Sequence, residues 1–97
     1  MIIDKGTIGK LEMSMESIHR EYGCYFELNS VSGNEITIEY TQRMQKCTNY
    51  ELSGGIFRIL ESEFEKRGFV LSKITLPEPS TMHITFWYNP KFVDEDE

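Results

Sequence analysis

The residues best suited to chemistry in this sequence are His83 and Thr85, which lie two positions apart in a run of alternating apolar and polar residues. This alternation predicts a half-buried strand, so both side chains should project from the same face of a sheet. An imidazole and a hydroxyl side by side can bind one phosphate group and exchange protons with it. A small phosphate-handling enzyme that uses His83 and Thr85 is therefore one hypothesis.

The segment His83-Ile84-Thr85-Phe86 resembles one half of the signature of the two-histidine phosphoesterases. The resemblance implies that His83 and Thr85 would point at one phosphate. That family needs two such motifs and has longer chains, and here the only other histidine, His19, is followed by Arg20-Glu21, which does not match. Because four-residue patterns of common strand residues arise by chance, an exposed strand histidine is the favoured interpretation.

The sequence predicts neither a metal site nor a cofactor. No two of Cys24, Cys47, His19 and His83 have the spacing that is typical of structural zinc sites. Two cysteines do not make a disulfide framework, and free thiols in a reducing compartment are the favoured state.

The alternation that places His83 and Thr85 outward also places Trp87 outward, beside them. An outward tryptophan is covered either by residues 10–22 of the same chain or by a partner, since aromatic anchors are enriched at interfaces. Both explanations remain open. Glutamates and a threonine of the preceding hairpin are expected on the same face. The predicted partner-binding residues are Trp87, Thr85, Glu27, Glu35, Thr37 and Glu39.

The charge of the chain favours one class of partner. Ten basic and sixteen acidic residues give a formal charge of −6, which disfavours direct binding to nucleic acid or to an anionic membrane and permits docking on a basic protein. The small, acidic, motif-poor composition resembles that of the small inhibitors and adaptors carried by phages and other mobile elements. The leading hypothesis is therefore a non-enzymatic protein-interaction module of this class.

The clearest secondary structure is a helix over residues 48–68, which the remaining elements must surround. Thr48 and Glu51 have the spacing of a capping box, and Gly68 can adopt a left-handed stop. Apolar residues recur at steps of three and four and predict one buried helix face: Leu52, Ile56, Ile59, Leu60 and Phe64. A single amphipathic helix needs an apolar sheet to lie on.

Three segments carry strand patterns. Residues 23–41 predict a hairpin with its turn near residues 30–34. Residues 69–76 have a mixed phase, which indicates a bulge or a central strand covered on both faces. Residues 82–88 predict a strand that ends at Asn89-Pro90.

Residues 10–22 fit two patterns. Leu11, Met13 and Met15 alternate with polar residues, which predicts a half-buried strand but leaves Ile18 and Tyr22 unexplained. A helix that ends at Gly23 buries the other apolar residues but leaves Met13 unexplained. The strand is favoured, after an extended lead-in over residues 1–9.

The predicted fold class is α+β: an antiparallel sheet of four to five strands, in hairpin–helix–hairpin order, with one main amphipathic helix on one face. We expect a single domain over residues 1–93 and an acidic tail over residues 94–97. No signal peptide or membrane span is evident, so a cytoplasmic location is expected. An open sheet face or edge strand in so small a domain is often covered by a second copy, so a homodimer is also expected.

Overall fold

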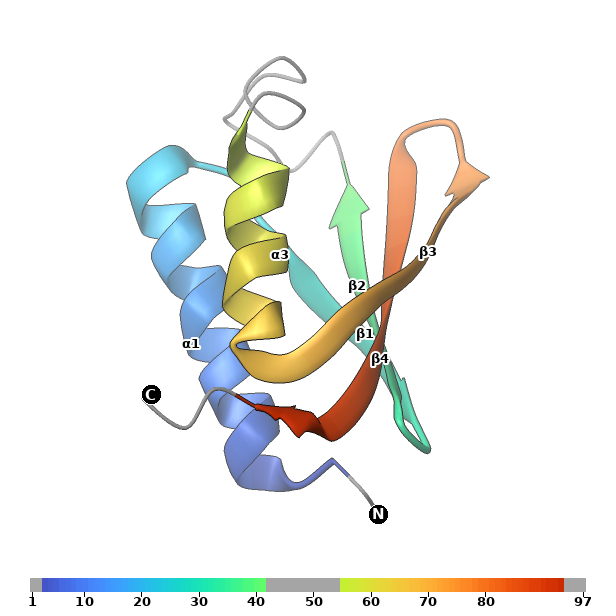
Figure 1. The fold of residues 1–97 in the computed structure, drawn as a ribbon. Helices are drawn as coiled ribbons and strands as arrows, with labels where there is room; N and C mark the ends of the chain where they lie inside the picture. Colours follow the sequence, from blue (N-terminus) through green and yellow to red (C-terminus); the bar gives the residue numbers. More distant parts are fainter. Residues whose placement is uncertain (1–2, 42–54, 94–97) are drawn as a thin grey trace.

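Two helices lie on one face of a four-stranded antiparallel sheet in the computed structural model, which describes residues 3–41 and 55–93 (Figure 1). The elements follow in the order α1 (Lys5–Tyr22), β1 (Glu27–Ser32), β2 (Glu35–Thr41), α3 (Phe57–Glu65), β3 (Arg67–Glu78) and β4 (Thr81–Val93). The strand order is β1-β2-β4-β3, so β1 and β3 are the edges of the sheet. The predicted α+β class is confirmed, with four strands in these two segments.

The strand favoured for residues 10–22, and the extended lead-in before it, are wrong, because residues 5–22 form the helix α1. The Asp4 carboxylate accepts a hydrogen bond from the Thr7 backbone N–H at 2.7 Å and caps the first turn. Gly23 ends the helix with φ of 78°, and its N–H donates to the His19 carbonyl. Met13, which a strand would have buried, is 70% exposed.

The predicted amphipathic helix is confirmed as α3, although its described part is shorter than residues 48–68. Ile56, Leu60 and Phe64 are buried, as their spacing predicts. The expected cap at Thr48 and Glu51, together with Leu52, lies outside the described residues. Gly68 has the predicted positive φ, 88°, but it lies in β3 rather than at the end of the helix.

Both hairpins are present, with two differences from the expected strands. The mixed phase of residues 69–76 is explained by register shifts along β3, which a bulge or a similar irregularity produces. The strand β3 is an edge strand and not a central one. The strand end predicted at Asn89-Pro90 is wrong, because β4 continues to Val93. The last register pair between β4 and β2 is Trp87 with Glu35. Pro90 therefore lies beyond the paired part of β4 and interrupts no hydrogen bond to β2.

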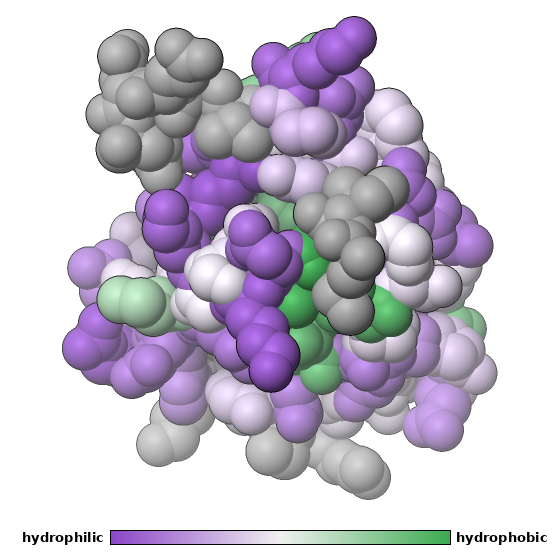
Figure 2. Space-filling model, turned by 90° about the horizontal axis from the view of Figure 1, so that it is seen from below, coloured by the Kyte–Doolittle hydropathy of each residue, from purple (hydrophilic) through white to green (hydrophobic). Residues whose placement is uncertain are grey.

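The core lies between the helices and the inner face of the sheet. Phe64 of α3 packs on Phe86 of β4 and Phe69 of β3, with ring centroids 4.4 and 6.0 Å apart. Leu11, Met15 and Ile18 extend the core along α1, and Ile36, Ile38 and Tyr40 extend it along β2. Seen from below, mostly hydrophilic residues surround a narrow apolar strip (Figure 2).

The expectation of free thiols is wrong for Cys24, which is fully buried and disulfide-bonded. The other cysteine of the sequence, Cys47, lies outside the described residues. Disulfides are typical of oxidising compartments, so this bond removes one argument for a cytoplasmic location. Neither α1 nor α3 has the length and apolar composition that a membrane span requires.

Candidate functional site

The register of the sheet brings all six predicted partner-binding residues and His83 onto the face opposite the helices. Glu35, Thr37 and Glu39 of β2 lie across from Trp87, Thr85 and His83 of β4, and Glu27 of β1 lies across from Glu39. We call this surface the outer face. Its residues are Glu27, Ser30, Ser32, Glu35, Thr37, Glu39, Thr41, Val70, Lys73, Thr75, Glu78, Thr81, His83, Thr85 and Trp87.

Glu39 is the centre of a polar cluster on the outer face. Its carboxylate accepts hydrogen bonds from His83 Nε2 at 3.1 Å and from Asn29 Nδ2 and Thr41 Oγ1 at 3.2 Å. Because a carboxylate only accepts, His83 must carry its proton on Nε2. Glu27 and Glu39 are opposed like charges, which alone would destabilise the pair of strands. The donors around Glu39 offset this repulsion.

The hydrogen bond from His83 is the largest cause that holds the pKa of Glu39 below its ordinary value of 4.5. The hydrogen bonds from Thr41 and Asn29 act in the same direction, and desolvation opposes them. Glu39 therefore stays ionised over the physiological range of pH and keeps the outer face acidic.

We expect the Glu39 cluster to stabilise the fold at neutral pH and to lose this contribution in acid. A carboxyl group whose pKa is lower in the folded chain than in the unfolded chain stabilises above its ordinary value of 4.5, and the contribution is lost as the pH falls through the folded-state pKa. Urea denaturation of wild type and Glu39→Gln, from neutral pH down through the folded-state pKa of Glu39, measures the effect. The difference between their free energies of unfolding should shrink on acidification; a difference that does not change with pH would contradict the assignment.

Thr85 is not available for contact, although it lies on the outer face as expected. It is 4% exposed, and its hydroxyl is 3.1 Å from the hydroxyl of Thr37, so the two form a hydrogen bond across β2 and β4. Neighbouring strands on both sides enclose it at the centre of the sheet. Thr85 therefore stabilises the pairing of β2 and β4, and the residues around it provide the accessible surface of the outer face.

Trp87 is 40% exposed and lies between Glu35 of β2 and Val70 of β3. The cover by residues 10–22 that the sequence left open is excluded, because α1 packs with α3 on the inner side of the sheet (Figure 1). Glu27 and Glu35 are also exposed. The accessible part of the outer face thus combines one large aromatic side chain with carboxylates, and the exposed Lys73 adds one cation to it.

Sequence reasoning missed the contributions of β3 and of Asn29. Val70, Lys73 and Thr75 lie on the outer face, but the shifts in register hide their alternation in the sequence. Asn29 lies where the β1 register shifts, and its amide reaches Glu39. The mixed phase of residues 69–76 was the available signal for the first group, and nothing local indicated the second.

No other chemistry is evident in the part of the chain that the structure describes. There, no group of three His, Cys, Asp or Glu side chains is placed so that it could hold a metal ion. No protein-family model, curated protein or solved structure matches this chain. Among the described residues, the geometry of the outer face is therefore the feature that bears on function.

Proposed function

We propose that this protein is a non-enzymatic protein-interaction module that docks on a basic partner through the outer face. The observation that carries the proposal is the exposed Trp87 beside the Glu35 carboxylate, on a sheet face that neither α1 nor α3 covers. Large aromatic side chains are the usual anchors of interfaces, and a charged rim accelerates encounter with an oppositely charged surface. The small acidic inhibitors and adaptors of phages and mobile elements are the class that fits this size and charge.

The geometry offers little support for the phosphate-handling alternative. His83 Nε2 is held by the Glu39 carboxylate, which would repel a phosphate placed there. Thr85 is buried and hydrogen-bonded to Thr37. A phosphodiesterase screen with wild type and His83→Ala tests this alternative: turnover that His83→Ala abolishes, with the fold intact, would favour the enzyme over the docking module.

The proposal is tested by the kinetics of binding to a partner captured from host lysate. Glu35→Gln should slow association roughly threefold at low salt and weaken its salt dependence, because an exposed charge near the anchor acts mainly on the encounter rate. Glu65→Gln, which removes the same charge from the exposed side of α3, is the matched control. Equal effects of the two substitutions would mean that only net charge matters and would count against the outer face.

Self-association through β3 is a further part of the proposal. This edge strand exposes three apolar side chains, Val70, Ile74 and Leu76, and the last two are 45% and 66% exposed. We expect sedimentation equilibrium at micromolar concentration to detect a dimer and Leu76→Lys to shift the equilibrium toward monomer. A wild-type protein that is monomeric throughout would remove the homodimer and leave docking through the outer face intact.

Location adds no support to the proposal. The cytoplasmic expectation depended partly on free thiols, and Cys24 is disulfide-bonded. Docking through carboxylates and a tryptophan does not require a particular compartment.

A further inference from the structure

An open cavity of about 370 Å³ lies between α1 and β1, away from the centre of the outer face. Its floor is apolar, because Met15 and Phe26 belong to the core and Leu28 packs against them. One side is formed by His19 and Tyr25, whose rings meet edge to face with centroids 5.2 Å apart. An aromatic and aliphatic floor of this kind accommodates the apolar part of a ligand.

The rim of the cavity is acidic. Glu12 and Glu16 lie one turn apart on α1, and Glu27 begins β1 on the other side. Among the described residues that line the cavity, none is a lysine or an arginine. Glu27 also belongs to the outer face, so the acidic surface continues around the edge of the sheet into this cavity. The charge and the floor together suit a cation on an apolar stem, such as a lysine or arginine side chain.

The backbone beside the cavity provides a third feature. Among the described strands, β1 pairs only with β2, so its second edge presents backbone N–H and C=O groups. A groove between an edge strand and a helix is one of the recurring ways in which proteins capture an extended peptide, which adds to the sheet as a new strand.

We infer that the groove between α1 and β1 binds an extended, basic segment of the partner as an added strand. Side chains of an extended peptide alternate between its two sides, so a lysine or arginine at every second position can face α1, with its apolar stem over Met15 and Phe26. The cations of this set can reach Glu12 and Glu16, and the other set lies on the side of Glu27 and the outer face. The inference rests on the proposed function only in taking the partner to be basic. It assigns part of the binding to a surface other than that around Trp87.

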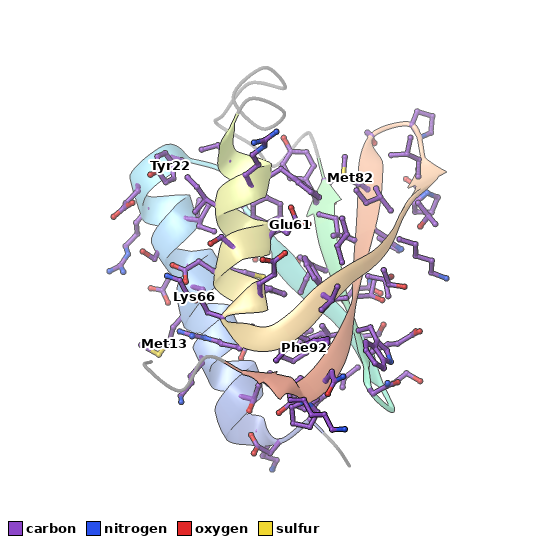
Figure 3. All side chains as sticks on the ribbon, in the orientation of Figure 1. Met13, Tyr22, Glu61, Lys66, Met82 and Phe92 are labelled. Atoms are coloured by element: carbon purple, nitrogen blue, oxygen red, sulfur yellow. The ribbon has the colours of Figure 1, made fainter. Side chains whose placement is uncertain are left out.

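The test uses the full chain and a short fluorescein-labelled peptide in which lysine alternates with valine, with Kd measured by anisotropy. The double variant Glu12→Gln/Glu16→Gln should weaken binding ~10-fold or more, since both rim charges are lost. The double variant Glu61→Gln/Glu65→Gln removes the same charge at the same spacing on α3, where Glu61 lies (Figure 3), and should change Kd less than ~2-fold. Equal losses in the two variants would overturn the inference.

Strand addition is tested separately by two N-methylated peptides, one methylated on its lysines and one on its valines. Only one set of N–H groups can face β1, so one of these peptides should lose binding and the other should retain it. If both bind as well as the parent peptide, or if arginine amide displaces the peptide at similar concentration, a single side chain occupies the cavity and strand addition is wrong.

The failure of this inference can be distinguished from the failure of the proposed function. Trp87→Ala should leave binding of the alternating peptide unchanged, because Trp87 does not line the cavity. A loss of peptide binding in Trp87→Ala, with little loss in Glu12→Gln/Glu16→Gln, would place the peptide on the outer face and overturn the groove. If Trp87→Ala retains binding to the partner, docking through the outer face is wrong, and the inference about the groove between α1 and β1 stands.

Discussion

Phe64→Ala is expected to destabilise the protein by ~3–5 kcal/mol. Phe64 is fully buried and joins α3 to both strands of the second hairpin through Phe69 and Phe86. Truncation removes the transfer free energy of the ring and leaves a cavity between helix and sheet. Leu60→Ala, at the next buried position of α3, should cost ~2–5 kcal/mol for the same reason. Urea denaturation followed by circular dichroism measures both changes.

The matched control is Met13→Ala, which also removes a large apolar side chain from a helix. Met13 lies on a solvent-exposed side of α1 and is 70% exposed (Figure 3), so its truncation should change stability by less than ~0.5 kcal/mol. A domain of this size is stabilised by about 5–15 kcal/mol, so Phe64→Ala should show a lowered midpoint and should remain partly folded. A loss below ~1 kcal/mol at Phe64 would mean that α3 does not pack on the sheet as described.

Trp87→Ala is expected to weaken binding to the partner by ~2 kcal/mol or more, which is about 30-fold in Kd, while leaving the fold intact. The indole is 40% exposed and stands beside Glu35, so it can be covered by a partner without rearrangement of the core. The change should lie mainly in the dissociation rate, because the lost contact is apolar and becomes buried on binding.

Trp87→Phe is the matched variant, since it keeps an aromatic ring at the same position and should recover part of the affinity. Urea denaturation accompanies both variants, and neither should lose more than ~1 kcal/mol of stability. If Trp87→Ala unfolds the domain, the indole is part of the core; if it binds the partner like wild type, the outer face is not the docking surface.

The fold was predictable from sequence wherever burial had a single periodicity. Ile56, Leu60 and Phe64 repeat only at helical spacing, and Ile36, Ile38 and Tyr40 only at strand spacing, so α3 and β2 followed directly. Residues 10–16 satisfied both periods, and the decision for α1 depended on caps and on burial against α3, which local alternation does not contain. The disulfide bond of Cys24 was not predictable for a similar reason, because the separation of two cysteines in the sequence does not indicate whether they are close in space.

The candidate site was predictable in its face but not in its accessibility. The alternation of apolar and polar residues along each strand was enough to place Trp87, Thr85 and Glu39 on one side of the sheet. It could not indicate that Thr85 would be enclosed by neighbouring strands. The hydrogen bonds of Glu39 required the β1–β2 and β2–β4 registers, which depend on pairing between segments far apart in the chain.

The most direct test of the exposed, acidic outer face is the quenching of tryptophan fluorescence, because Trp87 is the only tryptophan in the chain. At a concentration where the protein is monomeric, we predict a red-shifted emission that neutral acrylamide quenches. When each is divided by its quenching of free tryptophan at equal ionic strength, caesium should be more effective than iodide, because Glu35 lies beside the indole and attracts cations. A blue-shifted emission that none of the three quenches would contradict the docking surface proposed for this protein.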